Sequence, residues 1–453
     1  MRRRGDATEF RRADAPAFAV KILVLTNLYP PVSPGVGEWR CQAVVEALEL
    51  RGHNVQVLTS NFGITFEERG AEVERRLHLN GAFGQPAVTE FKALRTLELH
   101  NQRVVAETVA QFEPDVLFVW SLRGLSKSMI FSLAQFHRPV VYDVADDWMV
   151  TDLRRDPWLK WWNSERVPLP AQMRRRALEL TGARTKLDAL APTRPVDDPR
   201  ERMPDVFDVD ASGSPTGAAL RVFSFSRIYF CSEYLRGVAR AGGLAVEHAE
   251  IIRPGIATEV FFAEPRPVTQ QPRQLLVCTP LVKESGVLTA LMALQQLCAG
   301  GTKISLTICG RGPSDHVAQL RSYVIDHRLP VEFVNHAVRS RELTQLFRTA
   351  DIFLHTEEWP EPCVLTPLEA MVSGQAVIGS TAGGGAEIFR HRENALAFAP
   401  GDASALAGCI RTLIESPALR RAITEAGQTE VIGRYNEIAS ADRVENFLKE
   451  SLG

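Results

Sequence analysis

The sequence predicts an α/β protein made of two doubly wound units, each a parallel sheet covered by helices on both faces. Short β-branched runs alternate with helical patterns along most of the chain, which is typical of parallel sheets. The alternation pauses near residue 252 and resumes near residue 274, so it describes two units. A chain of 453 residues is also too long for one ordinary core.

The N-terminal half supplies the first predicted sheet. Residues 21–27 form an apolar strand, and a loop rich in Pro and Gly leads to a helical pattern from about Glu38. Gly52 follows that pattern, as expected where a helix ends in a left-handed residue. The predicted strands of this half are residues 21–27, 53–60, 115–120, 139–144 and 227–232.

The C-terminal half repeats the alternation and ends in three amphipathic helices. Residues 286–300 form a helix directly after the first strand of this half. The predicted strands are residues 274–280, 303–310, 330–335, 351–355 and 375–380, and the final helices are residues 402–415, 417–435 and 439–450. The two halves therefore have the same plan.

Composition sets the expected domain boundaries. Residues 1–19 are basic and mixed, without the apolar core of a signal peptide, so we expect a disordered leader there. Residues 20–252 form the predicted N-terminal domain and residues 274–436 the C-terminal domain. A Pro-rich linker, residues 253–273, joins them. Residues 148–222 are predicted to be an insertion in the N-terminal domain, aromatic at first and then rich in Pro, Asp and Arg.

Bulk composition excludes several classes of protein. The chain is 45% hydrophobic and 23% charged, as soluble globular proteins are, and its formal net charge of −2 argues against a nucleic-acid partner. No apolar run reaches the roughly 18 residues that a membrane span needs. The seven cysteines lack paired spacing, and no His/Cys cluster has metal-ligand spacing. We therefore expect a cytoplasmic protein with reduced thiols and no metal ion.

Gly35 and Gly37 lie in the loop "PPVSPGVGE" that follows the first strand. They allow the backbone to approach a ligand at a helix N-terminus, although a plain strand–helix loop explains them equally well. The loop is not a dinucleotide-binding fingerprint, because the G-x-G-x-x-G spacing is absent and Glu38 would repel a phosphate. A dehydrogenase is therefore disfavoured.

Two acids, Glu361 and Glu369, surround a helix start in "EPCVLTPLEAM". Thr366 is the predicted N-cap of this helix, and it forms a capping box with Glu369, which explains that residue structurally. Glu361 lies in the preceding loop and has no such explanation. A loop carboxylate beside a helix N-terminus is well placed to accept hydrogen bonds from sugar hydroxyls.

The wider segment "EEWPEPCVLTPLEAMVSGQAVIGSTAGGGAEIF" (357–389) resembles the donor-binding signature of the family 4 retaining glycosyltransferases. That signature has Glu-Pro-Phe-Gly, Leu-Glu-Ala-Met-Ala, a strand and a Gly-Gly-x-x-Glu turn. Further matches are "KILVLTNLYPP", "RGHNVQVLT", "RIYFCSEYLRGV", "LTICGRGP" and "ADIFLH". The resemblance covers most of the chain except the leader and much of 151–222. It implies the GT-B fold, in which two Rossmann-like domains face a central cleft, and a final helix (437–453) that packs back on the N-terminal domain.

The resemblance implies a reaction and its substrates. The protein would be a metal-independent retaining glycosyltransferase of the hexosyltransferase class, acting on a nucleotide-diphosphate sugar, with UDP or GDP expected. The acceptor, whether glycan, lipid or small molecule, is not identified, and no cofactor beyond the nucleotide sugar is implied. Three alternatives stay open for the tryptophans and basic helix in 156–186: weak peripheral contact with a membrane surface, contact with the acceptor, or packing on the N-terminal domain.

The resemblance also assigns residues to the donor site. Glu361 would contact hydroxyls of the donor sugar, and Glu369 the nucleotide ribose. The backbone amides of the segment that follows Glu361 would approach the sugar and the diphosphate, and the glycine loop would face the phosphates from across the cleft. The residues assigned to the donor and its nucleotide are Glu369, Cys363, Val364, Leu365, Gly35, Gly37, Gly310 and Arg311.

The sequence departs from the family where positive charge is expected. Pro280 and Ser285 stand where the family has an Arg and a Lys, cations that stabilise the leaving diphosphate. Lys283 and Arg311 are candidate replacements, and ordinary loop charge explains both equally well. Ala145 replaces a histidine near the sugar. Asp146 follows it and joins Glu361 and Lys283 as a candidate catalytic residue.

These departures favour a second hypothesis from another class. A catalytically silent GT-B protein that binds a nucleotide or a partner enzyme would lack the same groups, and Val364 in place of the usual Gly fits it as well. A sugar-nucleotide epimerase is a third possibility with no specific support in the sequence.

Overall fold

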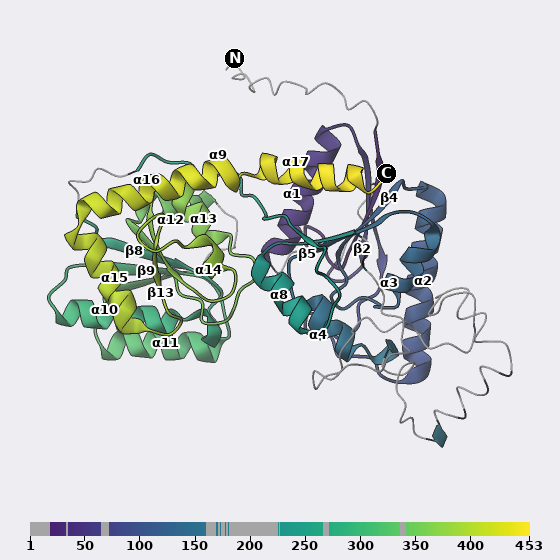
Figure 1. Cartoon of the computed structure of the whole chain (residues 1–453). Coiled ribbons are helices and arrows are strands. Elements are labelled where there is room, and N and C mark those ends of the chain that lie inside the picture. The colour runs from purple at the N-terminus through teal and green to yellow at the C-terminus, as the bar shows by residue number, and fades with distance from the viewer. Residues whose placement is uncertain are drawn as a thin grey trace, which may run out of the picture.

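The structure of the chain, a computed structural model, describes residues 19–32, 35–64, 72–159, 227–265, 271–335 and 341–453, with single positions between 169 and 225. Two α/β lobes lie side by side, and the last helices of the chain run along one edge of both (Figure 1). We call the sheet β1–β7 with its helices the N-terminal lobe, and the sheet β8–β13 with its helices the C-terminal lobe.

The N-terminal lobe contains a seven-stranded sheet of order β3-β2-β1-β4-β5-β6-β7, with parallel pairing throughout. β4 and β5 are buried along their whole length, because helices cover both faces of the sheet. The strands are β1 (Lys21–Thr26), β2 (Asn54–Ser60), β3 (Val73–Leu77), β4 (Val116–Ser121), β5 (Val140–Val144), β6 (Arg227–Phe230) and β7 (Glu250–Ile251).

Alternate residues of β1 enter different cores of this lobe. Ile22 and Val24 pack in the cluster that includes α1, whereas Leu23 and Leu25 pack in the cluster that includes α2. The helices of the lobe are α1 (Val36–Leu50), α2 (Phe91–Phe112), α3 (Met129–Leu133), η1 (Ala134–Phe136), α4 (Trp148–Arg155) and α8 (Glu233–Ala241). The period of two along the strand thus produces a sheet buried on both sides.

The C-terminal lobe contains a six-stranded parallel sheet of order β10-β9-β8-β11-β12-β13. Its strands are β8 (Gln274–Cys278), β9 (Ser305–Cys309), β10 (Val331–Val334), β11 (Ile352–His355), β12 (Ala376–Ser380) and β13 (Leu396–Phe398). Its helices are α9 (Thr258–Phe261), η2 (Lys283–Ser285), α10 (Val287–Ala299), α11 (Ser314–Asp326), α12 (Arg341–Thr349), α13 (Thr366–Val372), α14 (Gly385–Ile388), α15 (Ala403–Glu415) and α16 (Pro417–Arg434).

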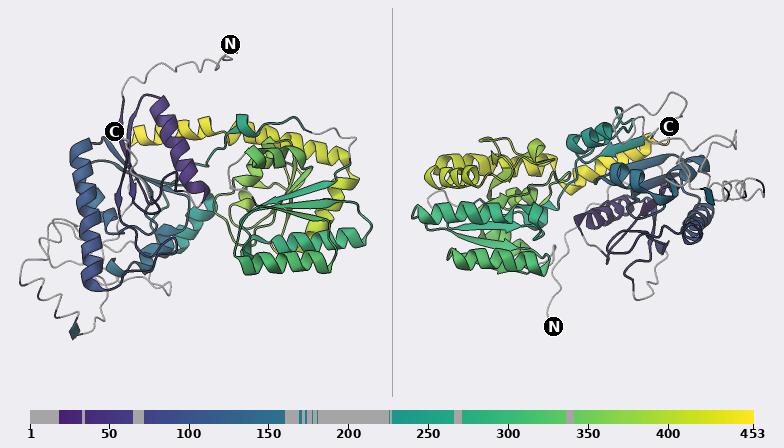
Figure 2. Two further views of the ribbon diagram at one scale, coloured as in Figure 1. Left: turned by 180° about the vertical axis from the view of Figure 1, so that it is seen from behind. Right: turned by 90° about the horizontal axis from the view of Figure 1, so that it is seen from below.

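The last helix, α17 (Glu437–Glu450), leaves the C-terminal lobe and lies against α1 of the N-terminal lobe, as Figures 1 and 2 both show. Arg51 pairs with Asp442 at 2.5 Å and with Glu445 at 3.1 Å. The Phe447 ring packs edge-on against Tyr229, with 5.2 Å between ring centroids. Residues from both ends of the chain therefore share one core.

Every strand predicted from the sequence is present, with ends that shift by a few residues. The predicted left-handed end of α1 is confirmed, because Gly52 has a φ of +90°. Three strands, β3, β7 and β13, were not predicted. The positions of the domain boundaries stay predictions, as does the cytoplasmic location. Within the described part of the chain, no helix is both long and apolar enough to cross a bilayer.

The beginning of the predicted insertion belongs to the N-terminal core. Trp148 and Trp158 are fully buried, and the Trp158 ring stacks near Phe91 at 6.2 Å. Of the three alternatives for residues 156–186, Trp158 therefore fits packing on the N-terminal domain. Its ring is not available to a membrane or an acceptor. The other two tryptophans, Trp161 and Trp162, lie outside the described residues, as do nearly all of 171–224 and residues 1–18 of the predicted leader.

Candidate active site

The loop between β11 and α13 carries Glu361, and a turn of three glycines supports it. The amide of Gly384 donates a 2.8 Å hydrogen bond to the Glu361 carbonyl. At Gly383 the φ is +55°, and a Cβ would lie 2.5 Å from the carbonyl carbon of Pro360. Neither the conformation nor the contact suits another residue type. The glycine turn, residues 383–385, therefore holds the loop that carries Glu361 in position.

Glu361 lies in a place that disfavours its negative charge. Its side chain is 29% exposed, and Oε2 lies 4.0 Å from Nε2 of His355. Burial, with the nearby Glu357 and Cys363, raises the pKa of Glu361 well above its usual range. Burial also lowers the pKa of His355 to about 3, so the imidazole is neutral. Hydroxyl groups that donate to the Glu361 carboxylate would restore its charged form.

Glu369 is buried in the first turn of α13, and the predicted capping box is wrong. Leu365 is the N-cap residue, with no side-chain cap, and Thr366 is already helical. The helix begins one residue earlier than predicted, so Thr366 cannot cap it. The charge of Glu369 acts on Cys278 at the end of β8, where burial, Cys309 and Glu369 together raise the pKa of the thiol.

A cavity of about 340 Å³ lies between the two lobes and contains most of the predicted site. Both lobes line it, and the predicted residues in its wall come from separate segments. The lining residues include Asn27, Gly35, Gly37, Glu38, Arg40, Phe83, Trp120, Arg123, Asp146, Trp359, Glu361, Cys363 and Leu365. The topology thus brings together residues more than 300 positions apart in the chain.

The glycine loop forms one wall of this cavity. Gly35 caps α1, and its amide donates to Oε2 of Glu38 at 3.3 Å. A Cβ at Gly37 would meet no atom within 4 Å, so the backbone there does not require glycine. Because neither Gly35 nor Gly37 has a side chain, the cavity has more space at this wall. The Glu38 carboxylate already occupies the positive end of α1, which agrees with the expected repulsion of a phosphate at that point.

Arg40 was not predicted, and it contributes a buried cation to the cavity wall. Its guanidinium lies over the Trp120 ring at 4.2 Å and forms an ion pair with the buried Asp143. Burial alone would lower the pKa of Arg40, but Asp143 outweighs it and the pKa is raised. The pair is therefore charged, and its net charge is close to zero.

Asp146 lies in the cavity wall and is held by a second arginine. Arg123 contacts Asp146 at 3.1 Å, Asp147 at 2.6 Å and Asp152 at 3.7 Å. Burial and the three carboxylates act in opposite directions on Arg123, and its pKa is raised overall. Trp148 donates its amide to Asp146 at 2.9 Å. Asp146 is thus a fixed acceptor in a group of net negative charge.

The loop that contains Pro280 and Ser285, where the similar family has an Arg and a Lys, places no charged side chain in the cavity wall. Ser285 is completely buried; its hydroxyl donates to the Val282 carbonyl at 2.7 Å, and its carbonyl accepts from Thr356 at 2.7 Å. Lys283 is exposed on η2 and does not line the cavity. Its predicted role as a substitute cation stays a prediction.

Gly310 and Arg311 line a second cavity, of about 650 Å³, at the ends of β9 and β10. Arg311 donates to Asn335 at 2.7 Å. Gly310 is needed for packing, because a Cβ there would lie 2.0 Å from the Thr279 carbonyl oxygen. Asn335, at the end of β10, was not predicted. The carboxyl ends of parallel strands are where ligands bind in doubly wound sheets.

The predicted residues thus separate into groups. Glu361, Cys363, Leu365, Gly35, Gly37 and Asp146 share the cavity between the lobes, whereas Gly310 and Arg311 share the second cavity. Val364 is buried in a small pocket behind the loop. Lys283 and Glu369 line neither cavity. Arg40, Arg123 and Trp359 were missed; each follows a strand end or a glycine motif, which is the signal that could have found them.

Comparison of the fold with solved structures places it among GT-B proteins. HepE of Anabaena, solved in complex with UDP and with UDP-glucose, superposes with a TM-score of 0.61 over 95% of this chain and 100% of its own, at 18% identity. Sucrose-phosphate synthase from Thermosynechococcus elongatus gives 0.63 over 95% and 98%, at 17% identity. The chain therefore has the GT-B fold, as predicted.

The sequence comparisons concern the C-terminal lobe. Residues 261–430 match the family described as "Glycosyl transferases group 1". Over 201 residues the chain is 29% identical to the glycogen synthase of Mycobacterium tuberculosis, a match that covers 43% of this chain and 46% of that protein. The chain thus spans about half the length of the curated relatives it matches. The family match thus concerns residues 261–430, and the comparison of structures shows the GT-B fold for the chain.

Proposed function

We propose that the protein is a retaining glycosyltransferase of family 4 that moves a hexosyl group from a nucleoside diphosphate sugar to an acceptor. One observation carries the proposal: the donor-loop residues Glu361, Cys363 and Leu365 share a cavity with the glycine loop and with Asp146 of the opposite lobe. A reaction between two substrates needs such a shared space, because transfer requires that the reacting groups meet without water.

In this proposal the donor lies along the C-terminal lobe. Glu361 accepts hydrogen bonds from sugar hydroxyls, which favours the carboxylate that burial otherwise destabilises. Glu369, near the end of β8, holds the ribose. The second cavity, with Arg311 and Asn335, takes the base. UDP fits the proposal, since HepE binds UDP and UDP-glucose within the same fold; GDP is the other expected nucleotide.

The acceptor would enter from the N-terminal lobe, where Asp146 and Arg123 offer fixed polar groups beside Trp359. Trp359 is 44% exposed in this cavity, and exposed aromatic rings pack well against the apolar faces of sugars. No metal ion or further cofactor takes part in the proposed reaction.

A second candidate function is nucleotide binding without transfer. One observation favours it: the two described arginines in the cavity wall, Arg40 and Arg123, are already paired with carboxylates, while Pro280 and the buried Ser285 replace the family's cations. If no cation other than these two described arginines reaches the leaving diphosphate, the charge that develops on it is poorly stabilised, which typically costs a few kcal/mol of barrier.

A thermal-shift panel tests the binding step that both functions share. UDP-, GDP-, ADP- and dTDP-glucose are added at millimolar concentration, with the free nucleotides as controls. A donor at about 100 times its Kd stabilises by roughly 2.7 kcal/mol, so the unfolding midpoint should rise clearly for one nucleotide. Glu369→Gln should lose this shift, whereas Glu332→Gln, an exposed change on β10, should keep it.

Release of the nucleoside diphosphate then separates the two functions. The transferase should release it from the sugar that gave the shift, either to an added sugar acceptor or slowly to water. Binding with no release under any acceptor would favour the silent protein. A flat panel for all four donors would contradict both proposals.

A further inference from the structure

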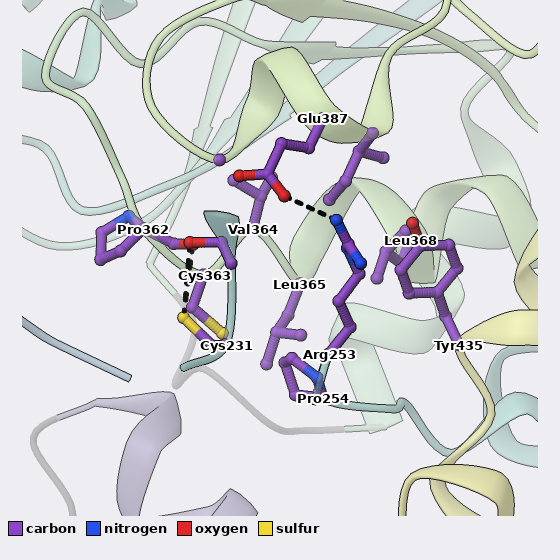
Figure 3. Close-up of a pocket in the computed structure, with 13 residues that line it drawn as sticks. Cys231, Arg253, Pro254, Pro362, Cys363, Val364, Leu365, Leu368, Glu387 and Tyr435 are labelled. Atoms are coloured by element: carbon purple, nitrogen blue, oxygen red, sulfur yellow. Dashed lines mark hydrogen bonds and ion pairs between the residues drawn. The ribbon is translucent and has the colours of Figure 1, made fainter. Parts of the chain in front are cut away.

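The two lobes meet at a pair of cysteines behind the donor loop. Cys231 follows β6 in the N-terminal lobe, and Cys363 follows Glu361 in the C-terminal lobe. Both thiols are free. Figure 3 shows their sulfur atoms next to each other. The Cys231 thiol also lies 3.4 Å from the carbonyl oxygen of Pro362.

The backbone around this pair is fixed on both sides. The Cys231 amide donates to Val144 in β5 at 3.0 Å. On the other side, the glycine turn supports the loop through Gly384. Glu387 of α14 adds a second link between the lobes, because its carboxylate accepts the Tyr234 amide at 2.6 Å. Glu387 also pairs with Arg253 at 2.7 Å, as Figure 3 shows. The thiols therefore lie next to each other at a contact between the two lobes.

The two thiols differ in access and in environment. Cys363 lines the cavity between the lobes and is half-buried. Cys231 is 4% exposed and lies behind it. The neighbouring Cys231 thiol and the nearby Arg40 lower the pKa of Cys363, whereas the neighbouring Cys363 thiol and burial raise the pKa of Cys231. Thiolates attack disulfides, so Cys363 should react first.

We propose that Cys231 and Cys363 form a reversible disulfide that ties the donor loop to the N-terminal lobe. With glutathione disulfide as oxidant, the Cys363 thiolate attacks one sulfur and expels a glutathione thiolate. Cys231 then loses its proton and attacks the Cys363 sulfur, which expels the second glutathione. Two protein thiols are oxidised to one disulfide, and one glutathione disulfide is reduced to two thiols that take up the two protons.

The disulfide would add a covalent bond between the lobes that the reduced protein lacks. In the reduced state the described contacts between the loop and the N-terminal lobe are noncovalent: hydrogen bonds, an ion pair and the packing of Cys363 on the N-terminal core. Such contacts can break if the lobes separate to admit a ligand. A covalent bond between Cys231 and Cys363 prevents that separation. Oxidation would therefore hold the lobes in the closed arrangement.

The test is oxidation of the full chain with glutathione disulfide, followed by alkylation of remaining thiols, proteolysis and mass spectrometry without reductant. We expect a linked peptide that contains Cys231 and Cys363, and its loss after dithiothreitol. The oxidised protein should also unfold at a higher temperature than the reduced protein, because the link joins the two lobes. Cys231→Ser should form no link at this position and show no such rise.

Cys278 and Cys309 provide a matched control, since they face each other on neighbouring strands of one lobe. Cys278→Ser should behave like the natural sequence in both readouts. If oxidant leaves Cys363 only glutathionylated, or if Cys231→Ser shows the same thermal rise, the proposal is wrong.

A further expectation rests on the proposed function. The oxidised protein should lose its response to the nucleotide sugar, and reduction of the same sample with dithiothreitol should restore it. The two proposals fail in different ways: a reduced protein without any response contradicts the proposed function and leaves the linked peptide unaffected.

Discussion

Several carboxyl groups lie where water is largely excluded, and their neighbours determine whether they keep a negative charge. Asp143 is compensated by Arg40, whereas Glu361 has only the neutral His355 nearby among its described partners. Glu98 in α2 is 2% exposed and accepts a 2.5 Å hydrogen bond from Ser128. Burial, with the nearby Asp156, raises the pKa of Glu98 to about 8. At neutral pH Glu98 therefore holds a proton that an exposed glutamate would release.

This proton makes the stability of the protein depend on pH in a defined direction. Between pH 4.5 and about 8 the native state keeps the proton of Glu98 and the unfolded chain releases it, so this contribution to stability falls as pH rises. Glu98→Gln does not titrate. The free energy of unfolding of Glu98→Gln relative to the natural sequence should increase by about 1.4 kcal/mol per pH unit across the window.

Urea denaturation at pH 5, 6, 7 and 8 measures this difference. The exposed Glu332→Gln serves as control and should give a difference that is independent of pH. A constant difference for Glu98→Gln as well would show that Glu98 is ionised in the folded protein.

The residues of the site could be predicted only in part, for a physical reason. Glu361 and the glycine loop stand in local motifs, so the chain near them is enough to mark them. Arg40 and Arg123 acquire their roles from carboxylates elsewhere in the chain, such as Asp143, which is 103 positions from Arg40. Lys283 looked suitable by sequence spacing, yet the fold of η2 exposes it away from the cavity.

At the scale of elements, burial decides which strands could be predicted. β4 and β5 lie in the middle of a sheet with both faces covered, so their residues are mostly apolar. β3 is an edge strand with the sequence VERRL, half-buried along most of its length, and its charges hide the pattern. β13, the edge of the other sheet, has only three residues. The central strands were thus predictable, whereas three of the four edge strands, β3, β7 and β13, were not.

The glycine turn gives a prediction for this scale. Gly383→Ala should destabilise the protein by more than about 1 kcal/mol, because a Cβ would meet the backbone of Pro360 and the φ is positive. A Cβ at Gly408, in the middle of α15, would meet no atom within 4 Å, so Gly408→Ala should stabilise by about 0.4–1 kcal/mol. Urea denaturation of both variants measures these changes.

The same two variants also distinguish an effect on stability from an effect on ligand binding. Gly383→Ala should weaken the thermal shift with the nucleotide sugar, since the turn supports Glu361, and Gly408→Ala should leave it unchanged. Equal shifts in both variants would show that the loop does not depend on the turn.

At the scale of the whole molecule, α17 joins the lobes. Val444, Phe447 and Leu448 of this helix pack in the same core as Ile22 and Val24 of β1. His53 and Arg51, near the end of α1, contact Glu445 at 3.1 Å each. The N-terminal lobe therefore completes one face of its sheet with residues that follow the C-terminal lobe in the chain.

Phe447→Ala tests this dependence. Removal of a buried aromatic ring should cost about 3–5 kcal/mol, and the loss should fall on the N-terminal lobe. Calorimetry should then show an earlier transition for that lobe and a later one for the C-terminal lobe. Phe262→Ala, at a ring that is 42% exposed, is the control and should change the profile little. A single transition shifted as a whole would mean that the lobes unfold together.

The crossing of α17 also has a consequence for the order in which the chain folds during synthesis. Domains usually fold as they leave the ribosome, with the N-terminal one first. Here the first sheet to be synthesised cannot cover its α1 face until residues 444–448 have emerged, by which time all strands of the second sheet are available. The lobe that begins the sequence is therefore the one that finishes folding last.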